Sequence, residues 1–274
     1  MESIHAFNHQ AMSTWWQVRI SGGEAMYAAQ AAQAAFAVAD RMERLMSRFR
    51  DDSEISAIAG LPDGGRRRIP KELFDCLFLA REMEALTGGA FDIRTAAGIS
   101  RDALPRWRLE AAEREILVDS GSCRLDLGAI AKGFTLDRMA EELAEWEISS
   151  CLLMSSGSSI LAGDPPSGEE GWRVRLGEGE VAREVLLAGR AIGTSGTAMR
   201  GSHIIDSATG DASCRHCRSW AMSGSAAEAD ALSTAWMNMD WDQIAECCAR
   251  RPDIGAVIID HGGETRSAGT LSEF

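Results

Sequence analysis

The sequence has few basic residues for its length. Its 274 residues include 41 Asp and Glu but only 28 Lys and Arg, so the formal net charge is −13 and the pI is near 4.9. Proteins that bind duplex nucleic acid need a net basic face, and anionic membrane surfaces attract basic segments. We therefore expect neither nucleic acid nor an anionic membrane surface among the partners of this chain.

Long apolar runs are also missing. No segment reaches the roughly 18 apolar residues of a membrane-spanning helix, so no membrane segment is expected. The opening residues, MESIHAFNHQAMSTWW, lack the basic region and apolar core of a signal peptide, and there is no lipidation signal. These observations predict a soluble, cytoplasmic protein.

The cysteines follow neither a disulfide pattern nor a zinc pattern. The chain contains 7 cysteines at scattered positions, and an odd, scattered set is more consistent with reduced thiols than with a disulfide framework. Cys214-Arg-His-Cys217 has the spacing of half a structural zinc site. No second pair of ligands stands at a useful spacing, so we interpret this segment as an ordinary part of the fold.

The overall composition is that of a folded globular chain, with 45% hydrophobic and 25% charged residues. We find no repeat, low-complexity tract or interdomain linker, so residues 1–274 are expected to form a single domain. Local patterns predict helices over residues 24–49, 71–86, 131–146, 226–239 and 241–250. Strands are expected over residues 14–20, 116–118, 123–127, 152–154, 172–176, 184–187, 191–192, 203–205, 219–222 and 256–259, and a loop over 61–68. Because helices and strands mix without a strict βαβ alternation, this order favours an α+β domain over a doubly wound parallel sheet.

Polar motifs of small residues interrupt the apolar pattern at several places. In Asp126-Leu-Gly-Ala-Ile-Ala-Lys-Gly133, an acidic residue ends an expected strand and a helix begins around Lys132. Exposed backbone groups at such a junction can bind an anion or a metal-bound phosphate. The alternative is a capped strand-to-helix turn with Lys132 in solvent.

A second group of motifs carries hydroxyls, a carboxylate and a histidine. Asp230 and Thr234 are one helical turn apart and project from one face, which suits Mg²⁺ or Ca²⁺; the alternative is a polar pair on a helix surface. The hydroxyls and amides of Thr194-Ser195-Gly196 could cradle a phosphate, and His203 could transfer a proton near neutral pH. Otherwise they form a serine-rich turn and a hydrogen-bonded histidine.

Taken together and in this order, the motifs resemble those of the ApbE family of FAD:protein FMN transferases, over almost the whole chain. The segments that carry the resemblance are Ala11-Met-Ser-Thr14, Ser47-Arg-Phe-Arg-Asp-Asp-Ser-Glu-Ile-Ser56, Gly88-Gly-Ala-Phe-Asp92, Asp126-Leu-Gly-Ala-Ile-Ala-Lys-Gly133, Ala191-Ile-Gly-Thr-Ser-Gly196, His203-Ile-Ile-Asp206 and Ala229-Asp-Ala-Leu-Ser-Thr234. The resemblance implies a single α+β domain with antiparallel sheets and packed helices.

The resemblance also implies an activity and a set of site residues. Enzymes of this family hold FAD with Mg²⁺ on its pyrophosphate, transfer the FMN half to a threonine or serine of an acceptor protein, and release AMP. By resemblance, Ala129 (through its carbonyl), Asp230 and Thr234 would hold the metal, and His203 would be the candidate catalytic base. The residues that would line the FAD site are Met12, Phe49, Ala90, Phe91, Asp92, Asp126, Lys132 and Ile204.

The chain departs from the family pattern in and near these motifs. Ser13 replaces a glycine, the loop that begins at Ser156 differs, and Ala198, Ser207 and Ala208 replace other expected residues. Two alternatives to the transferase therefore stay open: a pyrophosphatase that splits FAD into FMN and AMP, and a flavin-binding protein without turnover. Members of the family are often exported, whereas no signal peptide is visible here.

Overall fold

The computed structural model describes residues 3–94, 104–120, 123–177, 182–196 and 215–272. The helices are α1 (Ala25–Met46), α2 (Glu54–Ala59), α3 (Lys71–Leu86), α4 (Ala131–Glu145), α5 (Ala226–Trp236) and α6 (Trp241–Arg250). The strands are β1 (Ile4–Ala11), β2 (Thr14–Ser21), β3 (Arg66–Arg68), β4 (Arg106–Glu110), β5 (Glu115–Ser120), β6 (Cys151–Ser155), β7 (Ser159–Ala162), β8 (Trp172–Leu176), β9 (Arg183–Leu187), β10 (Arg190–Gly196), β11 (Arg218–Ser223), β12 (Gly255–Ile259) and β13 (Thr265–Gly269).

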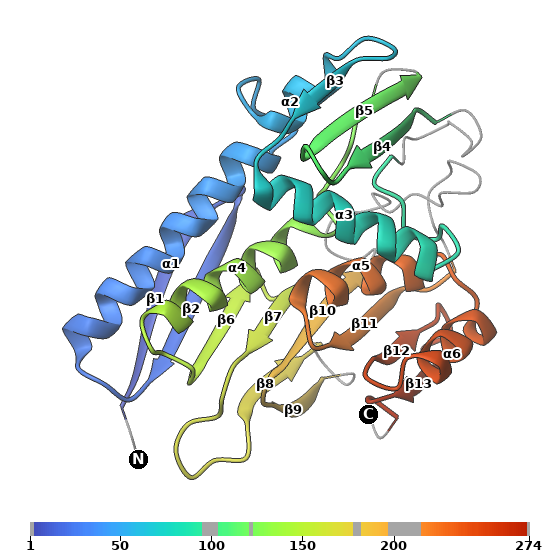
Figure 1. The fold of residues 1–274 in the computed structure, drawn as a ribbon. Coiled ribbons are helices and arrows are strands. Elements are labelled where there is room, and N and C mark those ends of the chain that lie inside the picture. Colours follow the sequence, from blue (N-terminus) through green and yellow to red (C-terminus); the bar gives the residue numbers. More distant parts are fainter. Residues whose placement is uncertain (1–2, 95–103, 121–122, 178–181, 197–214, 273–274) are drawn as a thin grey trace.

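The centre of the molecule is an eight-stranded sheet in the order β1-β2-β6-β7-β10-β11-β12-β13, in which every neighbouring pair is antiparallel. Helices α1, α4 and α5 lie across one face of this sheet (Figure 1). The other face packs against the two-stranded sheet β8-β9 through a second apolar cluster that includes Trp172 and Trp220. The α+β class with antiparallel sheets and packed helices is therefore confirmed.

A smaller antiparallel sheet, β3-β5-β4, stands beyond the C-terminal end of α1 and above α3 in the view of Figure 1. The sequence predicted a loop over residues 61–68, which is wrong for β3, because the three arginines of that strand pair with β5. The strand predicted over 123–127 is also wrong. That segment has no ladder partner among the described residues, and its Asp126 N–H donates instead to the carbonyl of Ile93 at 2.7 Å.

Side-chain caps mark the start of α2, α5 and α6. Ser53 accepts the Ser56 N–H at the start of α2, and Asp240 with Gln243 forms a capping box at the start of α6. The C-terminal end of α3 is followed by Gly88 and Gly89, both at positive φ. On α1, buried alanines at positions 28, 31, 32, 35 and 39 make a narrow stripe that faces the core.

The sequence also led to expectations about membrane-spanning helices and about the cysteines. Within the described residues, none of the helices is both long enough and apolar enough to cross a membrane. The cysteines that the structure describes are all free thiols, at positions 76, 123, 151, 217, 247 and 248. The prediction of reduced thiols is confirmed for these positions.

Candidate functional site

The carboxylate of Asp230 is buried where α5 meets α4 and the central sheet. The residue is 5% exposed. Its Oδ2 accepts the Gly133 N–H from α4 at 2.7 Å and the Ser159 hydroxyl from β7 at 2.9 Å. No described residue donates a hydrogen bond to Oδ1. Three elements far apart in the sequence therefore hold one oxygen of this carboxylate and leave the other available.

Burial controls the protonation of Asp230. Loss of solvent raises the pKa of this carboxyl from 3.8 to about 6, against the opposing effects of the Lys132 charge and of the bonds from Ser159 and Gly133. Lys132 stands in the first turn of α4 and is half-buried. A carboxyl with a raised pKa, a nearby cation and one available oxygen is a functional-site candidate.

Two glycines allow the backbones to approach one another at this point. A Cβ on Gly133 would lie 2.0 Å from the Ala226 carbonyl oxygen, and a Cβ on Gly193 of β10 would lie 2.3 Å from the Ala229 carbonyl oxygen. Either position therefore excludes any other residue without movement of α5. The glycines place Asp230 in direct reach of α4 and of the sheet.

The second expected ligand, Thr234, follows Asp230 on the same face of α5. Its Oγ1 lies 3.2 Å from the Ser195 Oγ on β10. Ser195 also bonds to the Ser233 hydroxyl at 3.0 Å. The alternative of a polar pair on a free helix surface does not describe Asp230, which is buried.

Helix α5 is fixed at its start by residues of other elements. Asp137 of α4 accepts the N–H groups of Ala226 and Ala227 at 2.8 and 3.0 Å and the Ser225 hydroxyl at 2.8 Å. Burial raises the pKa of Asp137 although these donors oppose that effect. An acidic side chain at a helix N-terminus offsets its unsatisfied N–H groups and its positive dipole end. We infer that Asp137 sets the position of the helix that carries Asp230.

The β1–β2 hairpin brings Met12 to helix α4. Met12 and Ser13 form its two-residue turn with φ values of 52° and 57°, the conformation that a tight hairpin requires. The Thr135 hydroxyl of α4 lies 3.6 Å from the Met12 Sδ. Since glycine adopts positive φ more readily, Ser13 holds this turn at a small conformational cost.

Arg48 connects two of the residues expected at the FAD site. Its guanidinium lies 3.3 Å from the Asp126 carboxylate and 4.7 Å from the centroid of the Phe49 ring. Phe49 is 81% exposed, and Asp126 also accepts the Gly128 N–H at 2.9 Å. An exposed aromatic ring beside a cation can stack on a planar ligand. The motifs did not single out Arg48, which falls inside the helix predicted over residues 24–49, whereas α1 ends at Met46.

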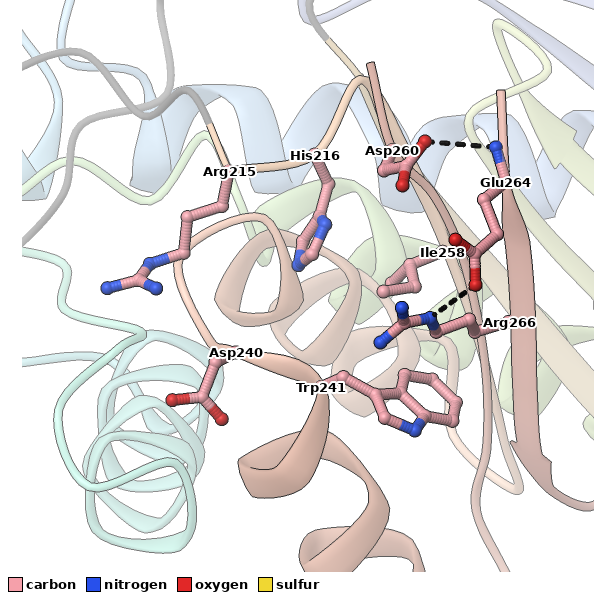
Figure 2. Close-up of a pocket in the computed structure, with 8 residues that line it drawn as sticks. All are labelled: Arg215, His216, Asp240, Trp241, Ile258, Asp260, Glu264 and Arg266. Atoms are coloured by element: carbon pink, nitrogen blue, oxygen red, sulfur yellow. Dashed lines mark hydrogen bonds and ion pairs between the residues drawn. The ribbon is translucent and has the colours of Figure 1, made fainter. Parts of the chain in front are cut away.

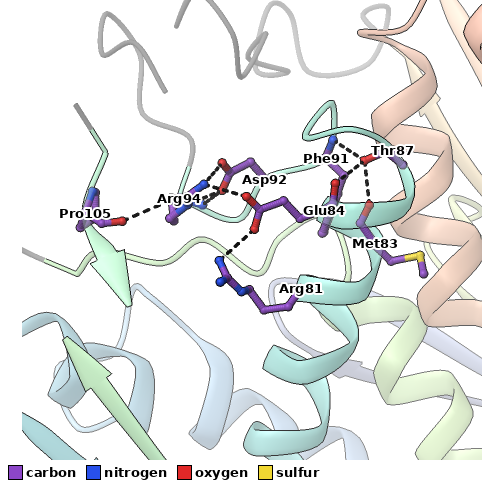
Figure 3. Close-up of polar contacts among 8 residues, drawn as sticks. All are labelled: Arg81, Met83, Glu84, Thr87, Phe91, Asp92, Arg94 and Pro105. Carbon is purple, nitrogen blue, oxygen red and sulfur yellow. Dashed lines mark hydrogen bonds and ion pairs between the residues drawn. The ribbon is translucent and has the colours of Figure 1, made fainter. Parts of the chain in front are cut away.

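The turn over residues 87–92 is held by side chains on both sides (Figure 3). Thr87 accepts the Phe91 N–H at 3.1 Å, and Asn238 donates to the Ala90 carbonyl at 3.0 Å. The Asp92 side chain is 1% exposed, and its two oxygens bond to Arg94 at 3.0 and 2.7 Å. The carboxylate of Asp92 therefore faces an arginine of its own chain, and Phe91 is buried in the core.

A separate pocket lies near α6 and β13, away from these residues (Figure 2). Its cavity volume is about 240 Å³, and its lining residues are Arg215, His216, Asp240, Trp241, Ile258, Asp260, Glu264 and Arg266. His216 bonds through Nε2 to the Met239 carbonyl at 2.9 Å, and burial lowers the pKa of its ring. His216 is accordingly a neutral, buried residue, and none of the predicted site residues lines this pocket.

The donor set around Asp230 fits a magnesium ion that is shared with a substrate. Among the described residues, no group of three or more His, Cys, Asp or Glu could hold a metal by itself. Mg²⁺ in proteins commonly takes one or two carboxylates and completes its shell with water and substrate phosphates. Asp230 and Thr234 offer oxygens of that kind, and Ala129 lies in the turn over residues 128–130, between Asp126 and α4.

The structure thus links the predicted residues through three sets of contacts, one of which is the pair Phe49 and Asp126 joined by Arg48. Asp230, Thr234 and Lys132 belong to the α4–α5–β10 junction, and Met12 reaches α4 through Thr135. Ala90, Phe91 and Asp92 form a turn tied to Asn238, which follows α5. His203 and Ile204 lie outside the described residues. The motifs did not predict the contacts of Ser159 and Asp137, which depend on pairings across the fold.

Known proteins are similar to this chain over most of its length. A family model described as the ApbE family matches residues 12–259. A Klebsiella pneumoniae (strain 342) protein named FAD:protein FMN transferase is 23% identical over 240 residues, covering 73% of this chain and 68% of that protein.

Solved structures show the same fold. The apo flavinyl transferase ApbE of Pseudomonas stutzeri superposes with a TM-score of 0.84 at 20% identity, covering 97% of this chain and 95% of that one. The flavin transferase ApbE of Vibrio cholerae superposes with a TM-score of 0.86 at 19% identity, covering 100% of both chains.

Proposed function

The chain belongs to the ApbE family, and from that premise we propose that it transfers the FMN moiety of FAD to a threonine or serine hydroxyl of an acceptor protein. The proposal includes dependence on Mg²⁺ and release of AMP. It is supported by the name of the Klebsiella relative and by the names of the structural neighbours.

The single observation that carries the proposal is the state of Asp230. A buried carboxyl with its pKa raised from 3.8 to about 6 costs the folded protein stability as the pH rises between these two values, unless a cation binds the carboxylate. One oxygen is held by Gly133 and Ser159, and no described residue donates to the other. If Asp230 had only a structural role, nothing would offset the stability that the folded protein loses when this buried carboxyl ionises.

Further contacts support a site for a pyrophosphate and its metal. Asp230, Thr234 and the Ala129 carbonyl are the proposed ligands, all of them oxygens. Ser155, across from Ser159 on the same face of the sheet, has a buried hydroxyl for which the described residues supply no partner. Bound Mg²⁺ would neutralise charge on the pyrophosphate as its phosphorus–oxygen bond breaks.

The proposed reaction exchanges one phosphorus–oxygen bond for another. The acceptor hydroxyl oxygen bonds to the FMN phosphorus of FAD, and the bond from that phosphorus to the bridging oxygen breaks. AMP leaves with that oxygen and its electron pair. The hydroxyl proton goes to a base, for which His203 is the candidate by resemblance.

The chain's own residues would bind and orient FAD in this reaction. Lys132 at the start of α4 would face the pyrophosphate, and Phe49 with Arg48 would offer a stacking surface. Met12 at the hairpin turn and the turn formed by Ala90, Phe91 and Asp92 would complete the walls of the flavin site, with Asp126 and Ile204.

The proposal is tested with the purified full chain, FAD and a candidate acceptor protein, with Mg²⁺ or with EDTA. We expect the acceptor to gain the mass of FMN less one water by intact-mass spectrometry, with AMP in equal amount and only when Mg²⁺ is present. AMP and free FMN formed at the same rate without any acceptor would make the protein a pyrophosphatase. FAD binding without either product would make it a flavin carrier.

A further inference from the structure

Three hydroxyl groups form a chain beside the proposed metal site. Ser233 on α5 donates to the Asp230 carbonyl oxygen at 2.9 Å. The Ser195 Oγ on β10 lies 3.0 Å from the Ser233 Oγ and 3.2 Å from the Thr234 Oγ1. Each hydroxyl can donate only one hydrogen bond, so the donor and the acceptor of every bond among these three hydroxyls can be assigned.

The direction follows from the only group that cannot donate. A carbonyl oxygen can only accept, so Ser233 donates its proton to the Asp230 carbonyl. In the bond between Ser195 and Ser233, Ser195 must then be the donor. In the bond between Ser195 and Thr234, Thr234 must in turn be the donor. Thr234 is therefore the donor at the end of the chain, and Ser195 is its acceptor.

This order decides what Thr234 can offer to a ligand. With its proton directed at Ser195, the Thr234 oxygen keeps its lone pairs for another partner, and Thr234 shares its face of α5 with Asp230. A cation requires lone pairs and is repelled by a hydroxyl proton. The usual alternative for a helical threonine is to donate to the carbonyl four residues earlier, which here belongs to Asp230 and already accepts from Ser233.

We propose that Ser195 is a positioning residue, which takes the Thr234 proton and so turns the Thr234 oxygen into a ligand for the divalent cation. The proposal rests on the proposed function, because the cation is the one that would accompany FAD. It adds Ser195, on strand β10 of the central sheet, to Asp230 and Thr234, the two residues of α5 that would touch the metal. Residues that orient metal ligands change metal affinity by about 10–100-fold when they are removed.

The test measures metal binding itself. Mn²⁺ serves as the probe and is titrated into the FAD-saturated full chain without acceptor, with free Mn²⁺ followed by EPR. We expect Ser195→Ala to weaken Mn²⁺ binding by about 10–100-fold and to leave metal-free FAD binding unchanged. Ser195→Thr keeps a hydroxyl on a strand residue and should restore most of the affinity. Ser267→Ala, on β13 of the same sheet, is the matched control, since its hydroxyl bonds only to the Ser272 carbonyl among the described contacts.

A double-mutant cycle shows whether Ser195 acts through Thr234. Thr234→Val should also weaken Mn²⁺ binding, and Ser195→Ala should add nothing in the Thr234→Val background. Ser195→Cys keeps the volume of the side chain but is a weak acceptor, so it should behave as Ser195→Ala does even if the alanine variant fails to fold.

The outcomes separate this proposal from the proposed function. If the wild-type chain with FAD binds no Mn²⁺, the metal-dependent function fails. If the wild type binds Mn²⁺ and Ser195→Ala or Ser195→Cys binds it equally well, the role of Ser195 is overturned while the function stands. Equal losses in Ser195→Ala and Ser195→Thr, or additive losses in the cycle, would also overturn it.

Discussion

Two buried aspartates of this protein have opposite surroundings. The Asp92 side chain is 1% exposed and both its oxygens bond to the guanidinium of Arg94, which also reaches Glu84 at 2.8 Å. Asp230 is 5% exposed, and backbone and hydroxyl donors hold one of its oxygens. A planar guanidinium matches a carboxylate with two parallel bonds, which fixes the geometry of both partners.

The difference indicates that the Asp92 carboxylate fixes the backbone of its own turn, whereas the Asp230 carboxylate has an oxygen available to a ligand. Arg94 joins the end of α3 to the 87–92 turn and to the Pro105 carbonyl (Figure 3). At Asp230 the positive charge of Lys132 lowers the pKa of the carboxyl, but burial raises that pKa by more. Asp92 is thus best understood as a positioning residue for the turn that contains Ala90, with only its backbone left to contact a flavin.

The largest effect is expected when the charge of Asp230 is removed. Asp230→Asn keeps an oxygen for Gly133 and Ser159 but removes the charged metal ligand. We expect flavin transfer to fall by about 10³-fold, which corresponds to about 4 kcal/mol of transition-state stabilisation. Initial rates of acceptor flavinylation at saturating FAD measure this, and full activity of the variant at limiting Mg²⁺ would contradict the metal assignment.

The next effect concerns the stability of the Asp92 region. Arg94→Leu removes the cation shared by the buried Asp92 and the half-buried Glu84 carboxylates, and we expect the free energy of unfolding to fall by about 3–5 kcal/mol. Arg81→Ala is the matched control, because Arg81 bonds to Glu84 from a 42% exposed side chain and should cost less than about 1 kcal/mol. Urea unfolding at pH 7 compares the two, and equal losses would remove the distinction between buried and exposed partners.

The third prediction is a pH dependence that belongs to Asp230. Its folded pKa of about 6 lies above the unfolded value of 3.8, so the folded state binds the proton more strongly and metal-free stability falls as pH rises from about 4 to about 6. The full loss is about 3 kcal/mol at pH 7. Asp230→Asn lacks this loss, so without metal it should be the more stable protein at pH 7, and the gap should close below pH 4. A gap that does not change with pH would contradict the raised pKa.

The smallest effect tests the cap of α5. The two carboxylate oxygens of Asp137 accept hydrogen bonds from three donors, whereas an asparagine side chain has only one acceptor oxygen. We expect Asp137→Asn to lower the free energy of unfolding by about 1–2 kcal/mol. Asp240→Asn at the local cap of α6 should be nearly neutral, because Asn and Asp are equally good N-caps. Thermal unfolding of both variants measures this, and a neutral Asp137→Asn would show that Asp137 does not fix α5.

Sequence patterns predicted the long helices well and the polar strands poorly. The helix expected over 131–146 is α4, and the one expected over 226–239 contains α5, because both are rich in strong helix formers. Strands β1 and β4 were missed because they carry polar or charged residues on an exposed face, as in Arg-Trp-Arg-Leu-Glu of β4. The error over 123–127 has the opposite cause: apolar residues there pack in the core beside Ile93 without pairing in a sheet.

The sequence by itself determined that Asp230 and Thr234 share one face of a helix, since the 3.6-residue period decides this locally. It also determined a sharp turn before α4 and, through the order of its motifs, the family. Only the tertiary structure decided that Asp230 is buried and that Ser195 meets Thr234. These contacts join Asp230 to residues 97 and 71 positions away and Ser195 to a residue 39 positions away. The physical reason is that burial and hydrogen-bond partners are properties of packed layers, and glycines 133 and 193 let those layers approach closely enough to make them.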